Sequence, residues 1–222
     1  PDDEAEIGAT TGGTNNTALF SATAPDPDES DFVRVFVGDV ITLPAETIVD
    51  GDDEDVTANY VTTVDCTGGA LSGTNGQEAN TLTIEEDDAA TDIVFTFTNE
   101  RKAVDLTLAK SWVNALEGDA VEVTATGLTT LNAVAGPTDE TDTGDTQTVH
   151  AGDVITIAES FVAPALAANY APTLACDGTD DAADGSLTID PDDDAITCTF
   201  TNTRTTLTVI KTVINDDGGT AV

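Results

Sequence analysis

The chain has 222 residues, of which 43 are acidic and six are basic, so its formal net charge is −37. Phosphate binding needs lysine and arginine clusters, so this composition excludes nucleic acid as a partner and disfavours anionic membrane surfaces. Apolar residues make up 39% of the chain, which is too many for a disordered acidic tail. No apolar run approaches the roughly 18 residues of a membrane helix, so we expect no direct membrane insertion of this segment.

The charge also indicates the surroundings in which the chain folds. Self-repulsion at this charge density destabilises a compact state, and salt relieves it, because the Debye length falls to about 3 Å at 1 M ionic strength. We therefore expect an extracellular, salty or cation-rich setting, with no cofactor other than calcium or high salt.

The strands predicted along the chain repeat with a period near one hundred residues. The sequence GDVITL at 38–43 recurs as GDVITI at 152–157, and FTNER at 97–101 recurs as FTNTR at 200–204, offsets of 114 (152 − 38) and 103 (200 − 97). Alternating apolar and polar residues indicate strands with one buried face, and acidic turns such as 50–55 and 177–185 separate them. The pattern predicts an all-β fold of tandem immunoglobulin-like sandwiches rather than a solenoid.

One strand of the first repeat is missing from its expected place. Residues 106–114 (LTLAKSWVN) open the second repeat, and residues 207–215 (LTVIKTVIN) are a second copy of that opening, whereas the first repeat has none. We therefore divide the chain into a first repeat at 1–103 that lacks its first strand, a complete repeat at 104–204, and a donor strand at 205–222. These complementary defects favour head-to-tail assembly with other copies of the chain, or adjacent repeats of a longer tandem array.

The order of short motifs resembles a known family. A lysine four residues after a leucine in the first strand, a glutamate ahead of Asn-Tyr, and Phe-Thr-Asn in the last strand are similar to the prealbumin-like B-type domains of bacterial surface adhesins and pilins. The resemblance implies an extracellular, cell-surface location and an internal Lys–Asn isopeptide bond assisted by an acid. By position it implies Lys110, Asn202 and Glu159 in the complete repeat. Between neighbouring units it implies Lys211, Asn99 and Glu46.

The residues themselves are compatible with this chemistry. Lys110 and Lys211 share the parity of the apolar residues in their strands, so both point inward. Burial lowers the pKa of a lysine and raises that of a glutamate, which favours attack of a neutral amine on an amide. A simple Lys–Glu ion pair is the alternative. Glu46 stands one residue later than Glu159 in its motif, so a bulge at Pro44 is needed for it to face the core.

Cysteine positions differ between the repeats. Cys176 and Cys198 lie in the complete repeat, and we expect them to form a disulfide in an oxidising exterior. Cys66 aligns with Cys176, but Phe95 stands where the second cysteine would be. We therefore expect Cys66 to remain a free, buried thiol.

Other candidate sites are weaker. Asp190, Asp192 and Asp194 alternate as calcium ligands do, but the EF-hand pattern fails, and a solvated acidic surface is favoured. His150 is the only histidine, which argues against a zinc site or a catalytic triad.

These observations favour a structural module of an extracellular filament or adhesin stalk and disfavour an enzyme with turnover. The alternative function is a ligand-binding adhesin module with its site in the long loops at 67–80 or 130–147.

Overall fold

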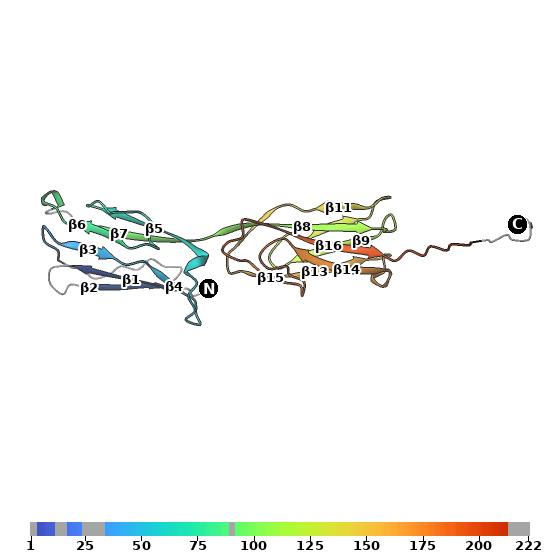
Figure 1. The fold of residues 1–222 in the computed structure, drawn as a ribbon, viewed down its shortest axis with the longest axis horizontal. Helices are drawn as coiled ribbons and strands as arrows, with labels where there is room; N and C mark the ends of the chain where they lie inside the picture. Colours follow the sequence, from blue (N-terminus) through green and yellow to red (C-terminus); the bar gives the residue numbers. More distant parts are fainter. Residues whose placement is uncertain (1–3, 12–16, 24–33, 89–91, 213–222) are drawn as a thin grey trace, which may run out of the picture.

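The computed structural model describes residues 4–11, 17–23, 34–88 and 92–212, and nearly all of its regular structure is β-strand. The predicted all-β sandwich fold is confirmed. Three short 3-10 helices, η1 (Thr57–Asn59), η2 (Glu86–Asp88) and η3 (Ala167–Asn169), complete the elements. Two sandwiches lie end to end along the long axis of the molecule (Figure 1).

The first unit, residues 4–101, consists of a five-stranded and a two-stranded sheet. Its strands are β1 (Glu4–Thr11), β2 (Thr17–Thr23), β3 (Val40–Leu43), β4 (Thr47–Val49), β5 (Tyr60–Thr67), β6 (Asn80–Thr83) and β7 (Val94–Arg101). The larger sheet has the order β2-β1-β3-β6, with β4 also on β1, and the smaller sheet is the antiparallel pair β5-β7. Its described core includes Ile41, Leu43, Val64, Leu82 and Ile84.

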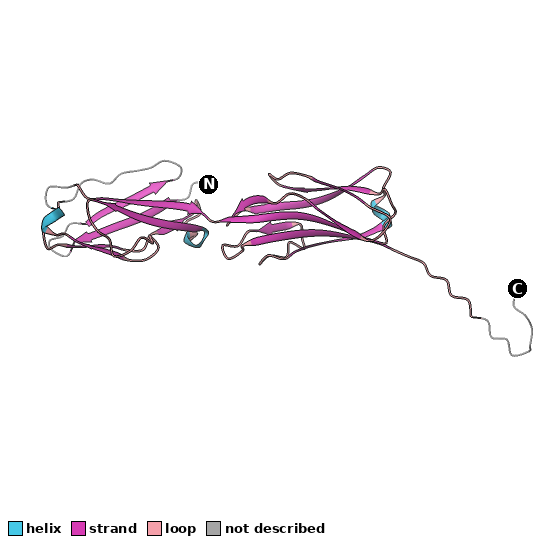
Figure 2. Ribbon diagram, turned by 90° about the horizontal axis from the view of Figure 1, so that it is seen from above, coloured by secondary structure: helices cyan, strands magenta, loops and turns pink. Residues whose placement is uncertain are grey.

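The second unit, residues 103–204, consists of a four-stranded and a five-stranded sheet. Its strands are β8 (Ala103–Val113), β9 (Ala120–Ala125), β10 (Leu131–Val134), β11 (Glu140–Thr143), β12 (Gln147–His150), β13 (Val154–Val162), β14 (Tyr170–Cys176), β15 (Ser186–Thr188) and β16 (Ala195–Arg204). One sheet has the order β10-β9-β13-β15, and the other has the order β11-β8-β16-β14 with β12 also on β8. Figure 2 shows the two layers from above.

The first and last strands of the second unit are adjacent and parallel. β8 and β16 pair over nine residues, with Lys110 opposite Phe200 and Trp112 opposite Asn202. Alternation along both strands places their apolar side chains in one core, which includes Leu106, Leu108, Trp112, Ile196 and Cys198. A bond between these strands would therefore tie the two ends of the unit together.

A single residue, Lys102, separates β7 from β8 at the joint between the units. Its N–H donates to the carbonyl of Asn59 in the first unit (2.9 Å), and its own carbonyl accepts from the N–H of Ala151 in the second (3.0 Å). Arg101 crosses the same joint and pairs with Asp153, with Nη2 2.8 Å from Oδ1. The chain thus passes from one sandwich into the next through a connection that hydrogen bonds and one ion pair hold to both units.

Candidate cross-linking sites

Lys110 is fully buried in the core of the second unit, where a charged amine is costly. Its Nζ lies 3.4 Å from Oε1 of Glu159, which comes from the opposite sheet on β13. Nζ also donates to the carbonyls of Ser111 (2.9 Å) and Phe200 (3.3 Å). The aromatic ring of Trp112 lies under it, with the centroid 4.3 Å away.

Glu159 connects Lys110 to Asn202. The side-chain amide of Asn202 donates from Nδ2 to Oε2 of Glu159 at 2.9 Å, and Asn202 is fully buried. The carbonyl oxygen Oδ1 of Asn202 is buried and has no hydrogen-bond partner among the described residues. The structure therefore brings the three predicted residues together, with one carboxylate oxygen facing the amine and the other facing the amide nitrogen.

The environment favours a neutral amine. Burial lowers the pKa of Lys110 from 10.5 to about 8, and the charges of Glu159 and Asp142 oppose part of that shift. A lysine with this pKa is partly deprotonated near neutral pH, as a nucleophile requires.

Sequence reasoning missed Asp142. It lies on β11 directly opposite Lys110, so both side chains lie on the same face of the sheet. Its Oδ2 atom is buried and has no hydrogen-bond partner among the described residues. The alternation of acid and threonine in residues 140–143 was the available signal, but it lies within a segment interpreted as a loop.

The first unit carries the same acid and amide. Glu46 is 3% exposed, and the side-chain amide of Asn99 donates to its Oε1 at 3.1 Å. Burial raises the pKa of Glu46, against the lowering effect of hydrogen bonds from Asn99 and Thr62. The strand is interrupted at Pro44, between β3 and β4, and this interruption turns Glu46 inward despite the extra residue.

No described lysine accompanies this pair, and one edge of its sheet is open. Among the described residues, β7 pairs only with β5, whereas its counterpart β16 lies between β14 and β8. Asn99 is consequently half-buried, while Asn202 is fully buried. Within the described residues, the first unit thus has a Glu–Asn pair beside a strand edge that no other strand covers.

The donor segment is described only as far as Thr212, and the rest of the predicted strand 205–222 lies outside the described residues. Residues 205–212 form no strand, and Leu207 and Val209 are 90% and 81% exposed. Lys211 is also exposed. This segment lies at the end of the molecule opposite the first unit (Figure 1).

The predicted disulfide is confirmed. Cys176 and Cys198 are bonded, and they face each other across the β14–β16 pair with Cα atoms 4.1 Å apart. Cys66 is free and partly buried in the first unit, and burial raises the pKa of its thiol.

We expect maleimide to label one thiol per chain in denaturant without reductant, and three thiols after reduction. Mass spectrometry of the labelled chain measures both numbers, and peptide mapping should place the single label on Cys66. Three labels without reductant would contradict the disulfide.

The weaker candidates do not form a metal site in the described chain. Residues 34–88 and 92–212 contain no group of three or more His, Cys, Asp or Glu that could hold a metal ion. Asp190 instead accepts the N–H of Asp192 at 2.9 Å, as a turn residue does. The backbone N–H of His150 donates to Asp153 at 3.0 Å.

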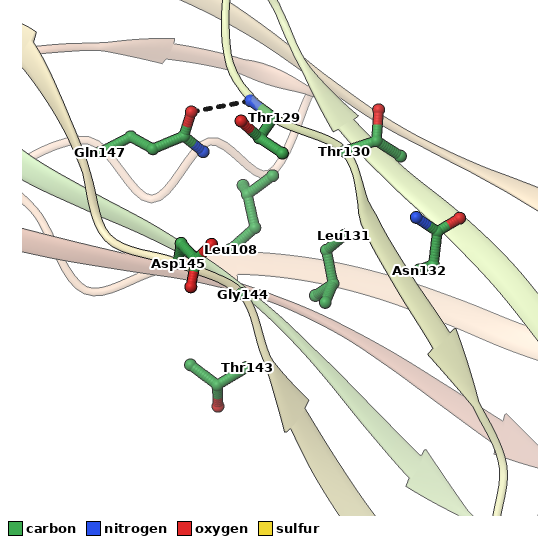
Figure 3. Close-up of a pocket in the computed structure, with 9 residues that line it drawn as sticks. All are labelled: Leu108, Thr129, Thr130, Leu131, Asn132, Thr143, Gly144, Asp145 and Gln147. Carbon is green, nitrogen blue, oxygen red and sulfur yellow. Dashed lines mark hydrogen bonds between the residues drawn. The ribbon is translucent and has the colours of Figure 1, made fainter.

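The loop region at 130–147, the alternative ligand site, contains a shallow pocket of about 290 Å³. Leu108 lies among its lining residues, and most of the others carry short polar side chains from residues 129–132 and 143–147 (Figure 3). Gln147 reaches across it to accept the N–H of Thr129 at 2.8 Å. The one acidic residue in the lining, Asp145, is exposed, so the pocket offers no buried charged group to a ligand.

The chain is similar in fold to solved pilus proteins, at low identity. The major pilin protein T-13 of Streptococcus pyogenes is 16% identical, with 92% of this chain and 90% of that chain covered and a TM-score of 0.39. The C-terminal fragment of the pilus adhesin SpaC of Lactobacillus rhamnosus GG is 10% identical, with 93% and 91% covered and a TM-score of 0.40. The major pilin protein T3.2 of S. pyogenes is 15% identical, with 92% and 90% covered and a TM-score of 0.36.

No protein-family model and no curated protein matches the chain. Within the described part of the chain, no helix has the length and apolar character to cross a membrane.

Proposed function

We propose that this chain is a structural module of an extracellular surface filament or adhesin stalk, assembled head-to-tail by strand donation and cross-linked by Lys–Asn isopeptide bonds. The single observation that carries the proposal is the contrast between the two units. The second unit holds a buried Lys–Glu–Asn group between its first and last strands, and the first unit holds the Glu–Asn pair beside an open strand position.

In the second unit, the neutral amine of Lys110 attacks Cγ of Asn202, and a C–N bond forms. Glu159 takes a proton from the attacking nitrogen through Oε1 and passes a proton to Nδ2, to which its Oε2 is already hydrogen-bonded. The Cγ–Nδ2 bond then breaks and ammonia leaves. The reaction occurs once, because the new amide contains both side chains.

The positions of the two reacting side chains contribute much of the rate of isopeptide bond formation. Lys110 and Asn202 come from adjacent parallel strands, so folding places the reactants together at a high effective concentration. The surrounding core excludes water and keeps the amine partly neutral.

In the first unit, a strand of the 207–213 type fills the open edge of β7. By analogy with β8, it runs parallel to β7 with Lys211 opposite Phe97, and this register directs the lysine toward Asn99 and Glu46. Burying aliphatic side chains such as Leu207 and Val209 contributes roughly 1.5–3 kcal/mol each before entropic costs. Because residues 205–212 and the first unit lie at opposite ends of the molecule, the recipient is the first unit of another copy or an adjacent repeat of a longer chain.

A covalent bond between the first and last strands of a unit makes that unit resistant to mechanical force. A pull on the unit acts on its first and last strands, β8 and β16, so a covalent bond between them prevents the chain from extending. The acidic surface keeps such a filament soluble in salt.

The pKa of Lys110 gives a pH prediction for a variant that cannot form the bond, Asn202→Ala. The folded pKa of about 8 lies below the ordinary lysine pKa of 10.5, so between these values the unfolded chain binds more protons than the folded chain. Stability should therefore rise with pH across that range and stay flat just below it. Urea unfolding at several pH values measures this, and Asn202→Ala/Lys110→Met should show no such rise.

The test of the whole proposal is a denaturing gel of the purified chain after incubation at high concentration. Bands at whole multiples of the chain mass should survive boiling in detergent and reductant, and electron microscopy should show filaments. A chain that remains monomeric at every concentration and ionic strength would reject head-to-tail assembly.

A further inference from the structure

The turn that precedes β3 and the turn that precedes β13 are built in the same way. In both 36–39 and 150–153, the aspartate carboxylate accepts the first residue's N–H at 3.0 Å. The glycine of each turn has a positive φ, +93° and +83°, and donates its N–H at 2.8 Å to an isoleucine carbonyl. The two turns are therefore structurally equivalent, and differences in their surroundings are informative.

Their surroundings differ. The turn at 150–153 lies at the internal joint, where Ala151 is fully buried. The turn at 36–39 lies at the outer end of the first unit (Figure 1), and Val37, which corresponds to Ala151, is 57% exposed. Phe36 beside it is 65% exposed. Phe36 and Val37 are therefore an exposed apolar pair at one end of the molecule, whereas the equivalent position in the other turn, Ala151, is buried. This difference points to a partner surface that covers the pair.

The end of the second unit that lies away from the internal joint has the same arrangement as the first unit's side of that joint. Arg204 pairs across the sheet with Tyr170 as Arg101 pairs with Tyr60, and a 3-10 helix precedes each tyrosine. Arg101 bonds to the turn at 150–153, whereas Arg204 has no ion pair with any described residue. Both halves of a second joint are thus present, at opposite ends of one molecule.

We propose that the turn at 36–39 of one copy docks against the Arg204 end of the second unit of another copy. This docking rests on the head-to-tail assembly proposed above and adds to it a surface that is separate from the donated strand. Charge is complementary, because Arg204 is one of only six basic residues and the turn presents Asp39.

The connection across the proposed joint between copies is shorter than the connection across the internal joint. Lys211 follows Arg204 by seven positions (211 − 204), and Lys110 follows Arg101 by nine (110 − 101). At about 3.3 Å per strand residue, the connection is about 7 Å shorter. A Cβ on Gly152 would lie 2.7 Å from Nδ2 of Asn59, so the internal joint is already closely packed. A shorter connection would bring Phe36 and Val37 still nearer to the partner.

The test compares two charge-matched variants. Phe36→Glu/Val37→Glu places acids in the proposed surface, and Val61→Glu/Val154→Glu places them at apolar sites of similar exposure, 52% and 63%, on β5 and β13 outside that surface. Light scattering follows the assembly rate of the full chain at fixed ionic strength. We expect the first variant to assemble about tenfold more slowly than the second, because carboxylates in place of Phe36 and Val37 would have to lose their water at the docking surface.

Equal rates for these two variants, with wild type still assembling, would overturn the docking surface and leave strand donation intact. Failure of the wild type to assemble would instead overturn head-to-tail assembly. A neutral variant, Phe36→Ser/Val37→Ser, separates lost contact from added charge, and it should also assemble more slowly than wild type. Circular dichroism of each variant checks its folding.

Discussion

The Glu159→Gln chain is expected to be heavier than the wild-type chain by the mass of one ammonia less the one mass unit by which glutamine is lighter than glutamate, because the wild type loses ammonia when Lys110 and Asn202 join. Glutamine keeps the shape of the side chain but cannot accept the proton that passes from the amine to the leaving nitrogen. Intact-mass spectrometry of the monomer fraction in denaturant measures the difference.

The same variant should also lose stability. The bond closes a loop of 92 residues (202 − 110), and a cross-link over such a loop stabilises a fold by about 4.6 kcal/mol in the chain-entropy model. Glu159→Gln additionally leaves a buried lysine without its counter-ion, which costs several kcal/mol more when the lysine is charged. Thermal and urea unfolding should both report the loss.

Glu122→Gln is the matched control, since Glu122 is an exposed glutamate on β9, next to β13. Its mass should show the same loss of ammonia as the wild type, and its stability should change little. A wild-type chain with an unmodified mass would reject the bond and leave a buried ion pair between Lys110 and Glu159.

The second large effect is expected for Lys211→Arg, which should abolish the detergent-resistant ladder. Arginine keeps the positive charge and the length of the side chain, but its guanidinium is not a nucleophile at neutral pH. Copies should still associate through strand pairing and the burial of Leu207 and Val209, so filaments should form but separate on boiling. Lys102→Arg is the control, and its ladder should match that of the wild type.

Val209→Asp tests the strand rather than the bond. Val209 shares the parity of Lys211, and a carboxylate at this position would have to be buried in the recipient sandwich. We expect association to weaken by a hundredfold or more, which is about 3 kcal/mol. Association of this variant at wild-type concentrations, measured by sedimentation, would show that the segment enters no sheet.

The sequence by itself determined the parts of this protein that depend on local pattern. Alternation placed Lys110 inward on its strand, and the recurrence of Phe-Thr-Asn placed Asn99 and Asn202 at the same point of two repeats. Alignment of the two repeats, together with an oxidising exterior, assigned the Cys176–Cys198 pair and left Cys66 without a partner. These features follow from the two-residue period of a strand, which fixes the face of every side chain once one is known.

Only the tertiary structure decided which strands meet. The parity of Glu46 left its direction open, and the break at Pro44 turned it inward toward Asn99. Asp142 became a neighbour of Lys110 only because β11 pairs with β8. The burial of Ala151 and the exposure of Phe36 likewise depend on how one unit packs against the next. Contacts between residues distant in the chain are set by packing, so no local pattern contains them.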